Sequence, residues 1–300
     1  MRKLIVLALV GLGAQLVDGS LGMGYGVTSS TLLVLAGLTP AAASASVHFS
    51  ELGTNLASGV AHWRLGNVDW RVVGRIAGPG AIGAFAGATV LSALSTQAAA
   101  PLMAAILAAL GLYIIIRFVL GVRPALKKAL TFKFLAPLGL FAGFIDASGG
   151  GGWGPVATPA LLVDGRMEPR KVIGSIDTSE FAVSMSASVG FLVGLGAAGI
   201  NWGFALALLA GGLVAAPLAA YLVRIAPAHL LGIAVGGLIL LTNSRTLLRT
   251  YDVSDPARFA VYGAVAALTL FGLRVAAQRV RRTASPAPAV DERASESVGV

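Results

Sequence analysis

The stretch DGSLGMGYG, residues 18–26, returns later in the chain as DASGGGGWG, residues 146–154. At a fixed offset of 128 residues, eight of the sixteen positions in 11–26 are identical to those in 139–154. Both copies lie inside otherwise apolar segments, where a charged residue and a cluster of glycines are costly. The chain is therefore predicted to be a duplicated membrane domain with one glycine motif in each half.

The composition of the chain is too apolar for a soluble protein. Hydrophobic residues make up 56% of the 300 positions and charged residues 12%, whereas soluble domains typically carry about 25% charged residues. The chain has no cysteine, which excludes disulfides, thiolate metal sites and cysteine nucleophiles. Its net charge of +9 comes from short basic clusters between apolar runs. This pattern indicates membrane topology and argues against a nucleic-acid partner.

Apolar segments divide the chain into spans. A helix needs about 20 apolar residues to cross a bilayer. Six uninterrupted spans of that kind occur, at 41–62, 76–95, 97–117, 172–198, 203–223 and 229–248, and a seventh at 257–277 has no partner in the first half. Segments 4–37 and 134–164 are longer, and the glycine motif interrupts each near its middle. We expect each of these two to form two short helices joined by an unwound turn.

These spans predict an all-α polytopic membrane protein built from two inverted repeats. Each repeat would contain a broken, re-entrant-like helix pair and three transmembrane helices, and one extra transmembrane helix would follow. The predicted boundaries are a first repeat at 1–120, a basic cytoplasmic loop at 121–133, a second repeat at 134–249, the extra helix at 250–280 and a disordered tail at 281–300. The apolar run after Met1 belongs to the first repeat and is not a cleaved signal, because its continuation matches the second repeat.

Basic residues favour the inverted arrangement of the repeats. If each broken segment returns to the side from which it entered, one side of the membrane collects most of the arginines and lysines. The other side then carries Arg2, Lys3, Arg245, Arg249 and Arg258. The bias is weaker if each broken segment crosses the membrane once.

Ionisable residues occur at matching places within the apolar segments of the two halves. Glu51, in VHFSELGTN, matches Glu180, in IDTSEFAVS, at an offset of 129. A carboxylate near the middle of the bilayer costs at least about 2.5 to 3.5 kcal/mol unless it is protonated, paired or hydrated. Buried acids that exchange protons are suited to proton coupling. The residues predicted to do so are Glu51, Glu180, Asp18, Asp146, His48 and Asp177.

A structural role is equally open for the two aspartates of the glycine motifs. Asp18 and Asp146 could each accept hydrogen bonds from the N–H groups of the unwound turn that follows. The two glutamates have no glycine beside them, so a functional role is the stronger interpretation for them.

The glycine turns predict an anion site. Successive N–H groups without β-carbons can converge into a concave nest, and the helix that follows points its positive end at the same place. The alternative is that the glycines only permit tight helix crossing. The residues predicted to bind substrate are Ser20, Gly22, Gly24, Tyr25, Gly26, Asn55, Ser148, Gly150, Gly152, Trp153 and Gly154.

Motifs for enzymatic chemistry are missing from the sequence. It contains no GxSxG nucleophile elbow, no HExxH zinc motif and no GxxxxGK[ST] nucleotide-binding loop. We therefore expect no enzyme activity, no cofactor and no bound metal.

The paired motifs resemble those of the TauE/SafE family of sulfite exporters and sulfonate permeases. The resemblance covers roughly residues 5–248 and rests on both glycine motifs, on Pro40 with the following AAASASVHFSELGTN, and on GNVDW at 66–70. It implies a secondary transporter of small sulfur-containing anions, such as sulfite or sulfonates. The chain departs from the family pattern in carrying the extra span 257–277 and a basic tail, and in having Ala147 in place of the glycine after the aspartate of the second copy.

Together, these observations predict a secondary active transporter of small sulfur-containing anions, coupled to protons. Its partners would be a small anionic substrate and the lipid bilayer, and a homo-oligomer is compatible with the sequence. It would be a multi-pass protein of the bacterial cytoplasmic (inner) membrane. The alternatives are a non-catalytic membrane subunit and a transporter of another small organic anion. The exact substrate, the direction of transport, the coupling ion and the oligomeric state are left open.

Overall fold

The computed structural model describes residues 2–120, 130–164, 167–222 and 228–284, and no strand occurs in these ranges. The first half contains α1 (Arg2–Leu21), α2 (Tyr25–Leu35), α3 (Pro40–Arg64), α4 (Trp70–Ala93) and α5 (Thr96–Leu120). The second half contains α6 (Phe132–Gly149), α7 (Trp153–Asp164), α8 (Pro169–Leu195), α9 (Trp202–Leu222) and α10 (Ala228–Thr250), and α11 (Asp255–Ala284) follows. Most of the predicted loop at 121–133 and of the tail at 281–300 lies outside the described residues.

The all-α membrane fold is confirmed. Within the described ranges, six helices are long and apolar enough to cross a membrane, namely α1, α4, α5, α8, α9 and α11. Helix α3 is not among them, because its buried face carries polar residues such as His48, Glu51 and Asn55. Helix α4 begins six residues before the predicted span, since Asp69 caps it by accepting a hydrogen bond from the N–H of Arg71 at 2.9 Å.

Both long segments are broken at the glycine motif, as predicted. Gly22 and Gly24 separate α1 from α2 with φ angles of 67° and 132°. Gly150 and Gly151 separate α6 from α7 with φ angles of 75° and 144°. Residues with a β-carbon rarely adopt these angles, so glycine at these positions ends one short helix and allows the next to start in a new direction.

The two halves are interlocked by reciprocal helix pairs. Helix α1 packs on α9 of the other half, and α4 packs on α6. Glycines let these backbones approach: a β-carbon added at Gly11 would lie 2.2 Å from the Leu208 carbonyl oxygen, and one at Gly83 would lie 2.0 Å from that of Leu140. The first helix of each half thus packs on the fourth helix of the other.

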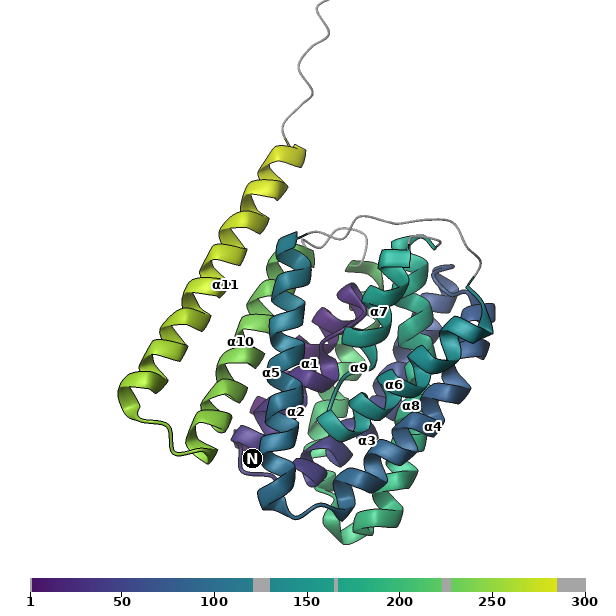
Figure 1. Cartoon of the computed structure of the whole chain (residues 1–300). Coiled ribbons are helices and arrows are strands. Elements are labelled where there is room, and N and C mark those ends of the chain that lie inside the picture. Colours follow the sequence, from purple (N-terminus) through teal and green to yellow (C-terminus); the bar gives the residue numbers. More distant parts are fainter. Residues whose placement is uncertain (1, 121–129, 165–166, 223–227, 285–300) are drawn as a thin grey trace, which may run out of the picture.

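The matching helices α5 and α10 pack together and run in opposite directions (Figure 1). Opposite directions are expected for equivalent helices of an inverted pair. The inversion of the complete halves stays a prediction. Helix α11 packs on α10 at the margin of the bundle, and much of its surface is exposed.

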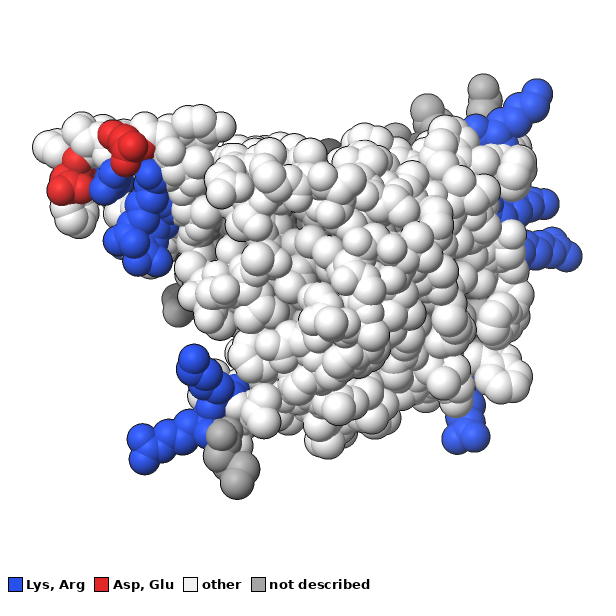
Figure 2. All heavy atoms as spheres, turned by 90° about the horizontal axis from the view of Figure 1, so that it is seen from below, with Lys and Arg blue, Asp and Glu red and all other residues white. Residues whose placement is uncertain are grey.

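One face of the molecule carries charged residues only at its edges (Figure 2). Figure 2 shows a face that is uncharged over its whole middle, with lysines and arginines at its edges and acidic residues at one corner. Asp18, Glu51, Asp146 and Glu180 are all buried. The acids that matter for the site are therefore inside the bundle.

Candidate functional site

Three ionisable side chains meet in a first buried cluster, which we call the first triad: His48 and Glu51 on α3 and Asp146 on α6. The Nδ1 atom of His48 lies 2.8 Å from Oε2 of Glu51 and 3.9 Å from Oδ2 of Asp146. The three side chains are at most 1% exposed. His48 therefore lies between two acids from different halves of the chain.

A second triad is formed by Asp177 and Glu180 on α8 and Asp18 on α1. One carboxylate oxygen of each lies within 4.8 Å of one from each of the others, and all three residues are buried. This grouping brings three potential negative charges together away from water.

The two triads occupy equivalent positions in the repeats. Each member of the first matches one of the second at the offset of 128 or 129. The one chemical difference is that His48 in the first triad is replaced by Asp177 in the second. The structure thus brings together all six residues predicted to couple protons, in two groups of three. Their role in proton coupling stays a prediction.

The aspartates hold the unwound turns. Oδ1 of Asp146 accepts hydrogen bonds from the N–H groups of Gly152 at 2.7 Å and Trp153 at 3.0 Å. Oδ1 of Asp18 accepts one from the N–H of Tyr25 at 3.3 Å. Each aspartate therefore has the capping role that the sequence left open. In this conformation these N–H donors face a carboxylate of the chain itself.

The two glycine breaks are in direct backbone contact. A β-carbon added at Gly26 would lie 2.7 Å from Cα of Gly151, and one at Gly154 would lie 2.7 Å from Cα of Met23. These two contacts are equivalent in the repeat. The two turns predicted to bind an anion thus meet at one place. Their close contact also agrees with the alternative interpretation, in which the glycines permit tight packing of helices.

The remaining polar side chains of the two glycine motifs form hydrogen bonds with other groups of the protein. The hydroxyls of Ser20 and Ser148 donate to carbonyls of their own helices, at 2.7 Å to Leu16 and 2.6 Å to Phe144. The hydroxyl of Tyr25 lies 2.9 Å from Oγ of Ser50. Nε1 of Trp153 donates to the carbonyl of Ile176 at 3.0 Å. Both aromatic side chains thereby fix the broken helices to the third helix of their own half.

Asn55 and Ser184 occupy equivalent positions, and they touch. Nδ2 of Asn55 lies 3.4 Å from Oγ of Ser184, which donates to Oε2 of Glu51 at 3.0 Å. Residues that are equivalent in two related halves can meet only near the axis that relates them. Asn55 therefore lies where the two halves meet and is linked to the first triad through Ser184.

Sequence reasoning missed several residues of this region. Ser184 is one, although its match to Asn55 at the offset of 129 was available as a signal. Arg117 on α5 is another: it is only 9% exposed, and its Nη1 donates to Sδ of Met23 at 3.4 Å. No local pattern distinguishes a buried arginine near a helix end from an exposed one.

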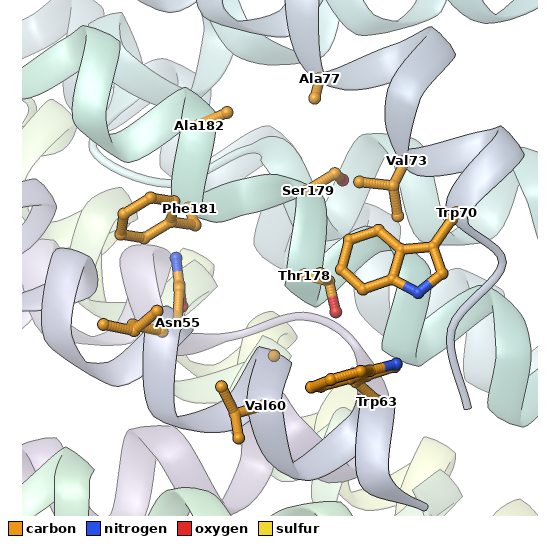
Figure 3. Close-up of a pocket in the computed structure, with 12 residues that line it drawn as sticks. Asn55, Val60, Trp63, Trp70, Val73, Ala77, Thr178, Ser179, Phe181 and Ala182 are labelled. Atoms are coloured by element: carbon orange, nitrogen blue, oxygen red, sulfur yellow. The ribbon is translucent and has the colours of Figure 1, made fainter. Parts of the chain in front are cut away.

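A cavity of about 300 Å³ lies between α3, α4 and α8. Figure 3 shows Trp63, Trp70 and Phe181 around it, with Asn55 on its wall. A second cavity, of about 470 Å³, lies beside α3 and α9 and includes Arg64. Neither of these two cavities is lined by a residue of the glycine breaks or of the two triads, and of the residues predicted to bind substrate only Asn55 lines one of them.

Ionisable groups buried where two broken helices cross inside a membrane bundle are typical of transporters. The protein is a multi-pass membrane transporter of the bacterial cytoplasmic membrane. The chain belongs to the TauE/SafE family, because the family model described as "Sulfite exporter TauE/SafE" matches residues 7–246.

A curated relative supports the same class. The chain is 50% identical over 273 residues to the "Probable membrane transporter protein YtnM" of Bacillus subtilis (strain 168), and the alignment covers 90% of this chain and 91% of that protein. No solved structure matches the chain. Transport of a small substrate across the bilayer is therefore established at the level of the class.

Proposed function

We propose that the protein is a secondary active transporter that moves a small sulfur-containing anion, such as sulfite or a sulfonate, together with protons. The family description supports the sulfur-containing substrate. The buried triads support coupling to an ion, because titratable groups are costly inside a membrane bundle and those that occur there usually mark an ion or substrate pathway. We expect the protein to act without a catalytic step.

The observation that carries this proposal is the position of the Asp146 carboxylate. Its Oδ1 accepts from the N–H groups of Gly152 and Trp153, at the positive end of α7. Sulfite and sulfonates present acceptor oxygens of the same kind. The aspartate therefore occupies the donors that a substrate anion would use, so substrate and aspartate compete for the same N–H groups.

This competition links the anion to a proton. A proton added to Asp146 removes the negative charge that attracts the two N–H groups, and the donors become available to a substrate oxygen. His48 lies between Asp146 and Glu51 and can exchange protons with both. One proton on the first triad thus accompanies one anion at the second glycine break, which is symport.

Ligand-induced thermal stabilisation of the purified protein tests the substrate. A ligand that binds the folded state raises its apparent stability, so sulfite, sulfonates, thiosulfate, sulfate and simple carboxylates are compared at equal ionic strength. We expect selective stabilisation by a sulfur-containing anion. A flat response to all sulfur anions would refute this substrate class, and a response to carboxylates alone would favour another organic anion.

Two glycine variants test whether the anion binds at the second glycine break. A β-carbon at Gly152 would lie 2.7 Å from the Ile145 side chain and 3.0 Å from the N atom of Asp146, so Gly152→Ala should weaken the response to the anion. Gly74→Ala is the matched control, because no atom of the part of the chain that the structure describes lies within 4 Å of its added β-carbon. Equal anion responses in the two variants would place the substrate elsewhere.

A further inference from the structure

We propose that the second triad binds a hard cation of about the size of Na⁺ or Ca²⁺, in the place where the first triad carries the side chain of His48. Binding of the cation at this place does not depend on which substrate the protein transports. Only its use as a coupling ion rests on the function proposed above.

The geometry of the second triad fits such an ion. Asp18, Asp177 and Glu180 each offer a carboxylate oxygen, and these oxygens lie within 4.8 Å of one another. Oxygen ligands at about 2.3 to 2.6 Å from a central Ca²⁺ would be separated by at most this order of distance. Three carboxylates together in a buried place repel one another unless positive charge or protons compensate them.

Unpartnered oxygens point to a ligand at this place. Both carboxylate oxygens of Asp177 are buried, and although Asp18 and Ser58 lie close to them, neither oxygen forms a hydrogen bond of good geometry with a described residue. The hydroxyl of Ser58, on α3, is buried beside Asp177 and likewise forms no hydrogen bond of good geometry. Buried polar atoms are nearly always bonded, so these oxygens require an explanation. A donor set of carboxylates and a hydroxyl, without sulfur or nitrogen, suits a hard cation.

Comparison of the two triads explains why an ion is needed in one of them only. In the first triad, His48 contacts both Glu51 and Asp146 and supplies a positive charge when it is protonated. In the second triad, the equivalent residue is Asp177, which adds a negative charge instead. The first triad therefore includes a side chain that can carry positive charge, whereas none of the three members of the second triad can, and the proposed cation takes that role.

His62 is the internal group that competes with this explanation. It lies on α3 one turn beyond Ser58, next to Asp177, and its Nε2 has no hydrogen-bond partner among the described residues. Its Nδ1 lies 3.2 Å from Nδ2 of Asn67. If a protonated His62 neutralised the acids, the second triad would need no ion.

The bound ion would act on the first glycine break. Asp18 binds the N–H of Tyr25 through Oδ1, at the start of α2. An ion shared by Asp18 and the two acids of α8 would therefore join this break to the opposite half. Its release would loosen that connection.

The test is the thermal stability of the purified full-length protein in detergent at pH 8, with choline chloride replaced stepwise by NaCl, CaCl₂ or MgCl₂ at constant ionic strength. We expect a saturable rise of several degrees with Na⁺ or Ca²⁺ and a smaller rise with Mg²⁺, which demands shorter bonds. Equal stability in all salts, or a stability that follows pH alone, would overturn the proposal in favour of protonated acids.

Variants connect the effect to the triad. Asp177→His copies the first triad and should abolish the dependence of thermal stability on the cation. Asp177→Asn is the smaller change, and it should weaken binding of radioactive Na⁺ or Ca²⁺ at least tenfold. Glu168→Gln, which removes an exposed carboxylate elsewhere, and His62→Gln should both keep the response. Retention of the response in both Asp177 variants, or its loss in His62→Gln alone, would contradict the site. An anion panel without any response would refute the substrate but not this cation site.

Discussion

Ser30 and Thr158 occupy equivalent positions in the two halves, and each donates its hydroxyl to the broken segment of the other half. Oγ1 of Thr158 donates to the carbonyl of Gly22 at 2.6 Å, and Oγ of Ser30 donates to the carbonyl of Gly150. Each donor lies about one turn into α2 or α7. Each acceptor is the carbonyl of the first glycine of the break in the other half. The two breaks are thus fastened to each other by a reciprocal pair of hydrogen bonds.

Thr158→Val should destabilise the protein. Valine has nearly the shape of threonine but leaves the buried carbonyl of Gly22 without its donor, which costs about 1 to 3 kcal/mol. The midpoint of thermal or denaturant unfolding measures the loss. Thr89→Val is the control, since among the described residues the Thr89 hydroxyl bonds the Ala86 carbonyl of its own helix and no other group. Equal midpoints for the two variants would show that the bond between the breaks contributes nothing to stability.

Gly154→Ala should prevent the two breaks from packing. Its β-carbon would lie 2.6 Å from the carbonyl oxygen of Gly22, and backbone atoms cannot move aside as a flexible side chain can. We expect loss of monodisperse protein in size-exclusion chromatography. Gly13→Ala, which has nothing within 4 Å of its added β-carbon, should purify like the wild type. Normal yield and stability of Gly154→Ala would mean that the breaks are not in contact.

Asp146 has two roles that two substitutions separate. Asp146→Ala removes the acceptor for the Gly152 and Trp153 N–H groups and should cost about 0.5 to 2 kcal/mol of stability, as the loss of a helix cap does. Asp146→Asn keeps an acceptor oxygen and removes the charge. It should stay folded, bind the anion at least as tightly and lose the pH dependence of binding. An Asn variant with wild-type pH dependence would exclude Asp146 as the competing group.

Glu51→Gln should separate transport from binding. The amide can still accept from Ser184 but cannot exchange a proton with His48, 2.8 Å away in the native protein. We expect pH-dependent uptake to stop in proteoliposomes while stabilisation by the anion persists. Loss of both together would indicate a structural role for Glu51.

The sequence predicted the helices and the place of both breaks well, because these features depend on local patterns. The apolar spans show each helix, and the repeated glycines show where α1 and α6 end. The equivalence of Glu51 and Glu180 also follows from a simple offset.

The partners of these residues could not be predicted in the same way. Glu51 binds Ser184, 133 positions away, and Asp146 approaches His48 from the other half. Such contacts depend on how the halves pack, which no local periodicity encodes. For the same reason, the sequence could not decide whether Asp146 caps the turn or exchanges protons. In the structure its carboxylate contacts both the N–H groups of the glycine break and His48 of the first triad.

Uptake of a radiolabelled sulfonate or sulfite into proteoliposomes, with and without an imposed pH gradient, tests proton-coupled transport of the substrate. Proton-coupled transport predicts uptake above that of empty liposomes, accelerated when the outside is more acidic than the inside and returned to the rate without a gradient when an ionophore collapses the proton gradient. Uptake that is unaffected by the proton gradient would contradict proton coupling. The absence of any uptake of sulfur-containing anions would contradict the proposed transport function.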